Sequence, residues 1–375
     1  MSDKVGVYIH VPFCKKRCSY CDFYSGADIS AADEYTEALI KHINTYENIG
    51  CDTVYFGGGT PTYFGEDRLC DVLNVVKNTF DVCENAEITA ECNPKTVSLE
   101  GLCKMRKSGF NRLSIGMQSA VQKELDALGR INTAYDAENT VFMARKAGFE
   151  NISLDLMYGI PYQTLGSFSE TLDFALSLSP QHISAYMLKL EEGTPLCKNA
   201  DKYPFADEDE IVEMMSLCND TLEKNGIFRY EISNYAKKGM ESRHNLKYWN
   251  RDEYISFGPS SSSFYKGRRY TYTPCIGDYK DFCFGKRAEK DVLCEEEFPT
   301  EKEAEGEYIM LRLRLTEGIS KDEYKKITGK DFDTEYGEKI RKYVSLGFMK
   351  DAERVSFTDK GFALSNVILS DIVEF

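Results

Sequence analysis

The sequence predicts an α/β protein, a partial and open (β/α)6 barrel of the TIM type followed by a winged-helix-like α+β domain. Two observations carry this prediction. From about residue 4 to residue 225, six short apolar runs alternate with amphipathic helical patterns, as in parallel strands joined by right-handed crossovers. Near the carboxyl end, three helical patterns precede two short apolar runs. Six strand–helix units are fewer than the eight of a closed barrel, so we expect an open one.

Each expected strand is a short apolar run, and each expected helix repeats apolar residues every three to four positions. The strands are expected at 5–10, 53–56, 87–91, 112–116, 151–156 and 182–188. The helices are expected at 30–48, 66–79, 99–108, 135–147, 167–177 and 207–225. Active groups of such a sheet belong at the carboxyl ends of its strands.

The pattern changes after Tyr235, and we expect three regions, namely a barrel over 1–235, a linking region over 236–297 and a domain over 298–375. The linking region is rich in Tyr, Ser, Gly and Arg, which is typical of turns and short strands. In the last region, helices are expected at 301–313, 320–328, 333–346 and from 359, with strands at 348–350 and 355–357. This order resembles a winged helix without a basic recognition face, so packing or partner docking is favoured over DNA binding.

The composition excludes several classes of protein. The chain has 375 residues, 46 Lys plus Arg and 61 Asp plus Glu, so its net charge is −15 and nucleic-acid binding is disfavoured. Mean hydropathy is −0.42 and no apolar run is long enough to cross a membrane. The first apolar run is broken by His10, so we expect no signal peptide and a cytoplasmic protein, with room for peripheral association with a membrane.

Three of the 13 cysteines form a motif. Cys14, Cys18 and Cys21 have C-x3-C-x2-C spacing, and random placement gives roughly 0.016 such triplets. A structural zinc site would need a fourth ligand nearby, whereas the next cysteine is Cys51. Three thiolates fit a 4Fe–4S cluster that leaves one iron open. A cluster is therefore favoured, with zinc and bystander thiols as the alternatives.

A glycine run leaves the second expected strand. The segment from Gly57 to Pro61 reads GGGTP and lacks the Lys-Ser/Thr ending of a P-loop. One interpretation is a tight strand-to-loop turn. The other is a backbone that a ligand approaches closely, such as the amino-acid end of a cofactor bound to the open iron.

Together, the cysteine motif and GGGTP resemble the radical S-adenosylmethionine (SAM) superfamily. The flanking YIHVPFC and CDFYS segments are similar to its oxygen-independent coproporphyrinogen oxidase branch, and the likeness covers nearly the whole chain. The resemblance implies that SAM chelates the open iron and is cleaved to methionine and a 5′-deoxyadenosyl radical. It also implies a set of SAM contacts at Tyr8, Gly58, Gly59, Thr60, Glu91, Gln118, Arg130 and Asp155.

The residue types at these positions suit that role. Glu91 and Asp155 can accept hydrogen bonds from ammonium or ribose hydroxyls, and Arg130 can pair with a carboxylate. Taken singly, Glu91 could be a solvated strand end, Gln118 a turn residue and Arg130 a surface charge. Their joint position after successive strands favours a shared site.

One position separates two functions within this branch. The decarboxylating oxidases resemble C-x3-C-x2-C-x-C and carry an N-terminal extension, whereas Phe23 stands at the position of their additional cysteine. In both respects the sequence resembles the HemW-type heme chaperones. This resemblance implies that the protein binds heme and passes it to apo-hemoproteins. The alternative is an oxygen-independent coproporphyrinogen III dehydrogenase. Whether SAM is cleaved or merely held stays open.

A second motif bears on heme. Residues from His244 to Trp249 read HNLKYW, an HNxxYW pattern that the HemW-type proteins share and that implies heme binding. The imidazole of His244 could be an axial ligand. Alternatively, Tyr248 and Trp249 pack a core and His244 is hydrogen-bonded beside them. Other thiolate donors for heme are Cys275, Cys283 and Cys294.

The cysteine motif also contains positive charge. Lys15, Lys16 and Arg17 lie between the first two cysteines. They form either an ordinary exposed loop or a docking site for an acidic electron donor of the flavodoxin or ferredoxin type, which charge would steer.

Overall fold

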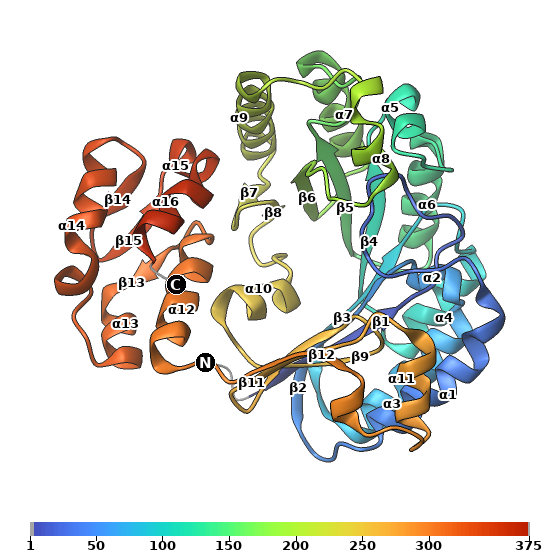
Figure 1. The fold of residues 1–375 in the computed structure, drawn as a ribbon. Coiled ribbons are helices and arrows are strands. Elements are labelled where there is room, and N and C mark those ends of the chain that lie inside the picture. The colour runs from blue at the N-terminus through green and yellow to red at the C-terminus, as the bar shows by residue number, and fades with distance from the viewer. Residues whose placement is uncertain (1–3, 374–375) are drawn as a thin grey trace.

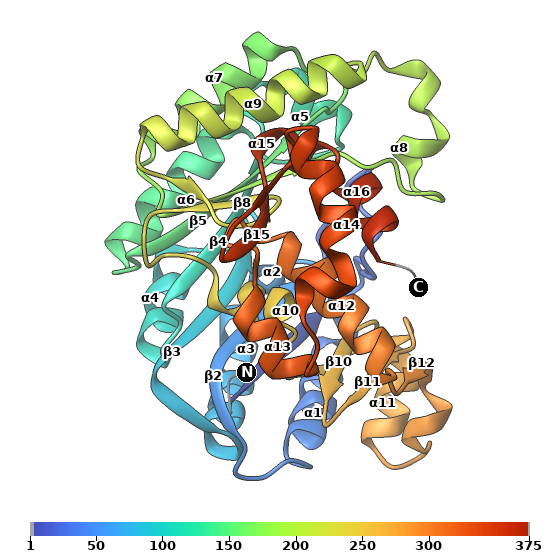
Figure 2. The ribbon, with the colours of Figure 1, turned by 90° about the vertical axis from the view of Figure 1, so that its left-hand side faces the viewer.

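A parallel sheet whose strands follow chain order forms the centre of the molecule. In the computed structural model, which describes residues 4–373, this sheet curves around a central hollow (Figures 1 and 2). The predicted open barrel is confirmed, because the 12-stranded sheet of the described residues ends at different strands on its two sides and does not close. The six parallel strands that follow chain order are β1 (Val5–Val11), β2 (Gly50–Gly58), β3 (Asp81–Cys92), β4 (Arg112–Gln118), β5 (Asn151–Tyr158) and β6 (His182–Met187).

Helices cover the outer face of this sheet. Two of them, α3 (Glu66–Thr79) and α4 (Leu99–Ser108), have the predicted bounds, while the helix predicted over 30–48 is a 3-10 turn (Ile29–Ala31) and α1 (Ala32–Ile43). The others are α6 (Ala134–Lys146), α7 (Leu165–Ser177) and α9 (Glu208–Lys224), with short helices α2 (Pro61–Phe64), α5 (Gln122–Ala127) and α8 (Pro195–Lys198).

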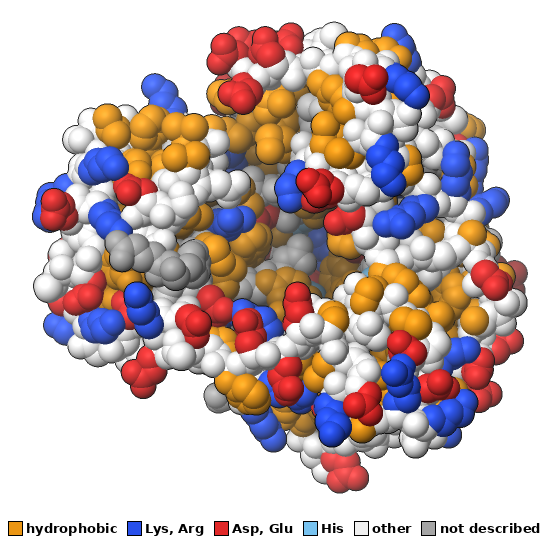
Figure 3. Space-filling view, in the orientation of Figure 1, with side chains coloured by type: hydrophobic (Ala, Val, Ile, Leu, Met, Phe, Trp, Pro, Cys, Tyr) orange, Lys and Arg blue, Asp and Glu red, His pale blue; other side chains and the backbone are white. Residues whose placement is uncertain are grey.

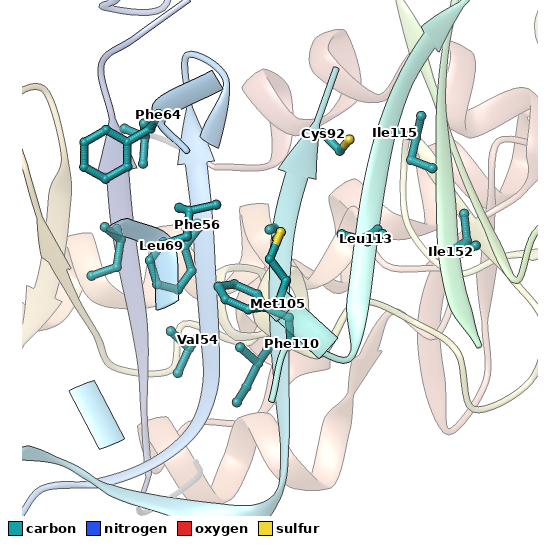
Figure 4. Packing of buried hydrophobic residues seen from close by; sticks show 14 of the residues in the cluster. Val54, Phe56, Phe64, Leu69, Cys92, Met105, Phe110, Leu113, Ile115 and Ile152 are labelled. Carbon is teal, nitrogen blue, oxygen red and sulfur yellow. The ribbon is translucent and has the colours of Figure 1, made fainter. Parts of the chain in front are cut away.

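The core lies between the sheet and these helices. Side chains from β2, β4 and α4 meet there, and Phe110, Leu113 and Val54 have no exposed surface (Figure 4). Burial of such side chains stabilises the fold by about 1.5–3 kcal/mol each. Because the outer face of each strand carries the apolar residues, the inner face is free to carry polar ones.

The region expected to link two domains extends the sheet. Strand β9 (Tyr254–Phe257) pairs parallel to β1, and β10 (Ser262–Tyr265), β11 (Arg268–Tyr272) and β12 (Leu293–Glu297) continue that edge antiparallel. At the other edge lie β8 (Asn234–Ala236) and β7 (Phe228–Arg229). Residues 254–297 thus share the core of the barrel, and the boundary at residue 235 stays a prediction. The region also contains α10 (Arg243–Asn250) and α11 (Ile276–Cys283).

The carboxyl-terminal unit has its own buried cluster and stands beside the open side of the barrel (Figure 1). A three-stranded antiparallel sheet forms its wing, in the order β13-β15-β14. An isolated β-bridge between Glu231 and Leu315 joins the two parts, as do the ion pairs Arg251–Glu307 and Arg229–Asp359. The elements are α12 (Glu301–Leu313), β13 (Ile319–Ser320), α13 (Lys321–Thr328), α14 (Phe332–Ser345), β14 (Met349–Asp351), β15 (Arg354–Phe357), α15 (Asp359–Ala363) and α16 (Ser365–Ile372).

We expect Phe110→Ala to lower the free energy of unfolding by about 3–5 kcal/mol, because it leaves a cavity in the sheet–helix core. The matched control is Phe142→Ala on α6, whose side chain is 66% exposed and whose loss should change stability by about 0.5 kcal/mol at most. Urea denaturation measures both, and equal effects would contradict this description of the core.

Candidate functional site

A cavity of about 490 Å³ occupies the inside of the barrel, between the inner faces of β2–β6 and the cysteine loop. The space-filling view shows the molecule hollowed at its centre, with apolar side chains around the rim (Figure 3). Along β4, every second residue lines the cavity, as expected where alternate side chains face one side of a sheet. These residues are Arg112, Ser114, Gly116 and Gln118.

The three predicted cysteines converge on one end of this cavity. Cys14, Cys18 and Cys21 all line it, and all three are free thiols. The Sγ atom of Cys14 lies 3.1 Å from Thr60 Oγ1, in the glycine motif. Burial raises the pKa of Cys21 to about 11, so the unliganded thiol is protonated at neutral pH.

The three thiols present fit a 4Fe–4S cluster, because they come from one loop at one end of the cavity. Among residues 4–373, no three Cys, His, Asp or Glu side chains are grouped as ligands of one metal ion. In a 4Fe–4S cluster each thiolate binds a different iron, so three sulfurs spread along a loop fit it. A cluster held by these three cysteines would leave one iron without a protein ligand.

The packing of neighbouring residues requires glycine at two positions of the GGGTP motif. Gly58 has φ of +107°, and a Cβ there would lie 2.7 Å from the ring of His10. A Cβ on Gly59 would lie 2.7 Å from the carbonyl oxygen of Phe13. The motif is therefore a tight turn packed against the end of β1, and its exposed side still lines the cavity. The two interpretations of the sequence are compatible here.

Two carboxylates line the cavity, Glu91 on β3 and Asp155 on β5. Glu91 Oε1 accepts a hydrogen bond of 2.9 Å from the Tyr55 hydroxyl, and Asp155 Oδ1 accepts one of 2.9 Å from Ser114. Burial and, secondarily, the charge of Asp155 raise the pKa of Glu91 to about 8. Burial also raises the pKa of Asp155. A cationic or hydroxyl-bearing ligand would stabilise both ionised forms.

Arg130 is held beside the cysteine loop. Its Nη2 atom donates to Asn93 Oδ1 at 2.9 Å and to the carbonyl of Gly116, and its Nη1 atom lies 3.7 Å from Cys18 Sγ. Gln118 is buried with φ of +68°, at a register irregularity between β4 and β5. Both residues line the cavity, and Arg130 places a positive charge beside the cysteines.

Two predicted site residues lie behind the wall. Tyr8 does not line the cavity; its ring stacks on those of Tyr55 and His244, at centroid distances of 6.1 and 6.3 Å. His244 is 1% exposed. Its Nδ1 lies 2.9 Å from Thr53 Oγ1 and its Nε2 lies 2.8 Å from the Tyr248 hydroxyl.

Both ring nitrogens of His244 are therefore engaged, and burial lowers the pKa of the imidazole to about 3. This is the packing arrangement that the sequence left as one of two interpretations. Ligation of heme by His244 stays a prediction, and it would require one of these hydrogen bonds to break.

Sequence reasoning missed several residues of the cavity wall. Arg112 and Asn245 both line it, and so does Phe23, which was singled out only as a missing cysteine. The signal was available for Arg112, since it precedes Gln118 by an even number of strand positions. The alternative thiols Cys275, Cys283 and Cys294 lie outside the cavity lining.

This arrangement defines a class of protein. Residues 8–175 match the family model described as Radical SAM superfamily, and residues 300–364 match the HemN C-terminal domain model. A solved structure of coproporphyrinogen III oxidase (HemN) from Escherichia coli has a TM-score of 0.84 and covers 99% of this chain and 90% of that chain. At 20% identity, this likeness shows the shared fold.

Curated relatives narrow the class. A heme chaperone HemW from Bacillus subtilis is 35% identical, over 96% of this chain and 97% of that protein. A heme chaperone HemW from Lactococcus lactis is 32% identical, over 96% and 94%. The chain belongs to the HemW family of radical SAM proteins, and the cofactors of that superfamily are a 4Fe–4S cluster and SAM. Within residues 4–373, no helix is long and apolar enough to span a bilayer.

We expect the raised pKa of Glu91 to make the ligand-free protein less stable as pH rises from 4.5 toward about 8. In that window the folded state keeps a proton that the unfolded state has released. Glu91→Gln removes the titration, so its free energy of unfolding minus that of the wild type should grow with pH. Denaturant titrations at several pH values measure this difference, and a constant value would contradict the raised pKa.

Proposed function

We propose that this chain is a heme chaperone that holds a 4Fe–4S cluster and SAM in the barrel, binds heme, and transfers the heme to apo-hemoproteins. The observation that carries the proposal is the similarity to HemW proteins over 96% of the chain. It is supported by Phe23, which is 64% exposed at the cavity where the oxidase pattern places another cysteine.

In this proposal, Cys14, Cys18 and Cys21 bind three irons of the cluster. When bound, the cluster supplies the electron for reductive chemistry on SAM. The backbone of Gly58, Gly59 and Thr60 contacts the methionyl part of SAM beside Cys14, which already touches Thr60. Arg130 contacts the carboxylate of SAM, and Glu91, Gln118 and Asp155 contact its ammonium group and ribose. Tyr8 does not touch SAM but packs behind Tyr55.

The mouth of the cavity suits the apolar face of a porphyrin. Phe23 and Met187 both line the cavity and are 64% and 52% exposed, so they offer apolar surface to a ligand. Tyr186 lies beside them and is 40% exposed. Aromatic and thioether side chains pack well against a flat conjugated ring.

We also propose that Lys15, Lys16 and Arg17 dock an acidic electron donor of the flavodoxin or ferredoxin type. All three are exposed in the loop that carries the cluster cysteines. Their charge would steer an acidic partner to the point where the electron is needed, and the association should weaken as salt increases.

The second candidate function is oxygen-independent coproporphyrinogen III dehydrogenation, which the likeness to the HemN fold favours. One experiment separates the two functions. Anaerobically reconstituted protein is titrated with hemin and, separately, incubated with coproporphyrinogen III, SAM and a reductant. We expect a shifted Soret band and no protoporphyrinogen. Efficient product formation would instead assign the chain to the dehydrogenases.

We expect Cys14→Ser, Cys18→Ser and Cys21→Ser each to abolish the broad absorbance that thiolate-bound iron–sulfur clusters show near roughly 400 nm, with loss of bound iron. The matched control is Cys103→Ser, because Cys103 is an exposed free thiol outside the cavity. Iron and sulfide analysis after anaerobic reconstitution measures the effect. A triple variant with full iron content would contradict the cluster assignment.

We expect His244→Ala to lower the unfolding temperature, because it empties a buried space and leaves Thr53 and Tyr248 without their partner. Hemin titration of the same variant decides the role of the ring. If His244 ligates the heme, the His244→Ala variant loses the Soret shift and keeps the cluster spectrum. An unchanged Soret shift would assign His244 to packing alone.

A further inference from the structure

The inner wall of the barrel contains a buried positive charge without a hydrogen-bonding partner. Arg112 begins β4 and is 2% exposed, and its side chain lines the cavity. The Nε atom is fully buried and has no partner, and no hydrogen bond or ion pair of this guanidinium occurs among the described residues. Because a guanidinium has five donors, burying it unsatisfied costs free energy that a bound acceptor would recover.

The carboxylates around Arg112 are committed elsewhere. Glu87 accepts hydrogen bonds from the backbone N–H groups of Arg243 and His244, at 3.0 and 3.1 Å, and so caps α10. Asp155 accepts from Ser114. Burial lowers the pKa of Arg112, but the charge of Glu87 and of other neighbouring groups outweighs it, so the pKa is raised and the side chain stays cationic.

A second polar group faces the same space. Asn245, from α10, lines the cavity, and its side-chain amide makes no hydrogen bond among the described residues. An amide and a guanidinium together can supply several N–H donors to one carboxylate. Asn245 is also the one member of the HNxxYW motif that reaches the cavity, whereas His244 is turned into the packing behind it.

Arg112 lies far from the end of the cavity that binds the cluster. Gln118 and Arg130 mark that end, and Arg112 lies six residues before Gln118 on β4, which corresponds to about 20 Å of strand. A SAM molecule chelating the cluster would place its carboxylate beside the cysteine loop. Arg112 lies nearer to Asp155 than to the place of that carboxylate, so its end of the cavity is open to a second acidic group.

We propose that Arg112 and Asn245 form a carboxylate-binding subsite, and that it takes a propionate of the bound heme. This inference rests on the proposed function. The porphyrin ring would then lie along the inner strands, with its apolar face toward Tyr186 and Met187 at the rim. The subsite gives the HNxxYW segment a contact with heme that does not use the imidazole.

The test uses the full-length protein with its cluster reconstituted, in titrations with hemin, with heme dimethyl ester and with SAM. We expect the wild type to bind hemin about 10- to 100-fold more tightly than the ester, the range for losing a hydrogen bond to a charged group. Arg112→Gln should lose most of the preference for hemin over the ester, and Asn245→Ala should lose less of it. Affinity for SAM should change less than affinity for hemin in both variants, because Arg112 acts on the proposed SAM contacts Glu91 and Asp155 only through its charge.

Arg243→Gln is the matched control. Like Arg112→Gln it removes one positive charge, but Arg243 is on α10 and lies outside the cavity lining. It should leave the preference for hemin intact. A wild type that binds hemin and the ester equally would overturn the subsite while leaving heme binding standing, and this comparison needs no variant to fold. Loss of SAM affinity rather than hemin affinity in Arg112→Gln would assign the carboxylate to SAM and overturn the inference. If the wild type binds neither hemin nor heme dimethyl ester, both the proposed function and the subsite are overturned.

Discussion

The junction between the carboxyl ends of β1 and β2 is the constraint on which the site depends. Two backbone hydrogen bonds join these ends, from Gly59 N to Val11 O at 2.8 Å and from Thr60 N to Phe13 O at 2.7 Å. They bring the glycine motif beside the loop that starts at Cys14. The parallel register of the two strands thus places the sulfur donors and the ligand-facing backbone at one edge of the sheet.

The two faces of the barrel sheet bury different kinds of side chain, apolar ones outside and polar ones inside. Its outer face supplies a close-packed core with the helices, whereas its inner face carries Glu91, Arg112 and Asp155 around a cavity. Ionisable groups in such surroundings are costly unless they are paired, and the raised pKa of Glu91 reflects that cost. The stability of the core therefore allows an interior that is arranged for ligands rather than for packing.

The sequence was informative where the pattern is local. The strands of the barrel and the grouping of Cys14, Cys18 and Cys21 could be predicted, because apolar runs and cysteine spacing involve neighbouring residues. Strands β9–β12 could not, since they are short, rich in Tyr, Ser and Arg, and depend on pairing with a distant edge. The two interpretations of His244 could not be separated either, because its partner Thr53 is 191 positions away. The even spacing of Arg112 and Gln118 along one strand indicates a shared face, but the lack of a hydrogen-bonding partner for Arg112 depends on its neighbours in space.

The absence of a side chain at Gly58 connects the glycine motif with the loop that carries the three cysteines. The His10 ring fills the space that a side chain at Gly58 would occupy, and its Nε2 atom lies 2.9 Å from the carbonyl oxygen of Tyr24, just beyond the last cysteine. Even alanine at position 58 would push this ring, and the ring would push the loop. Iron–sulfur assembly is therefore vulnerable to a residue that donates nothing to the metal.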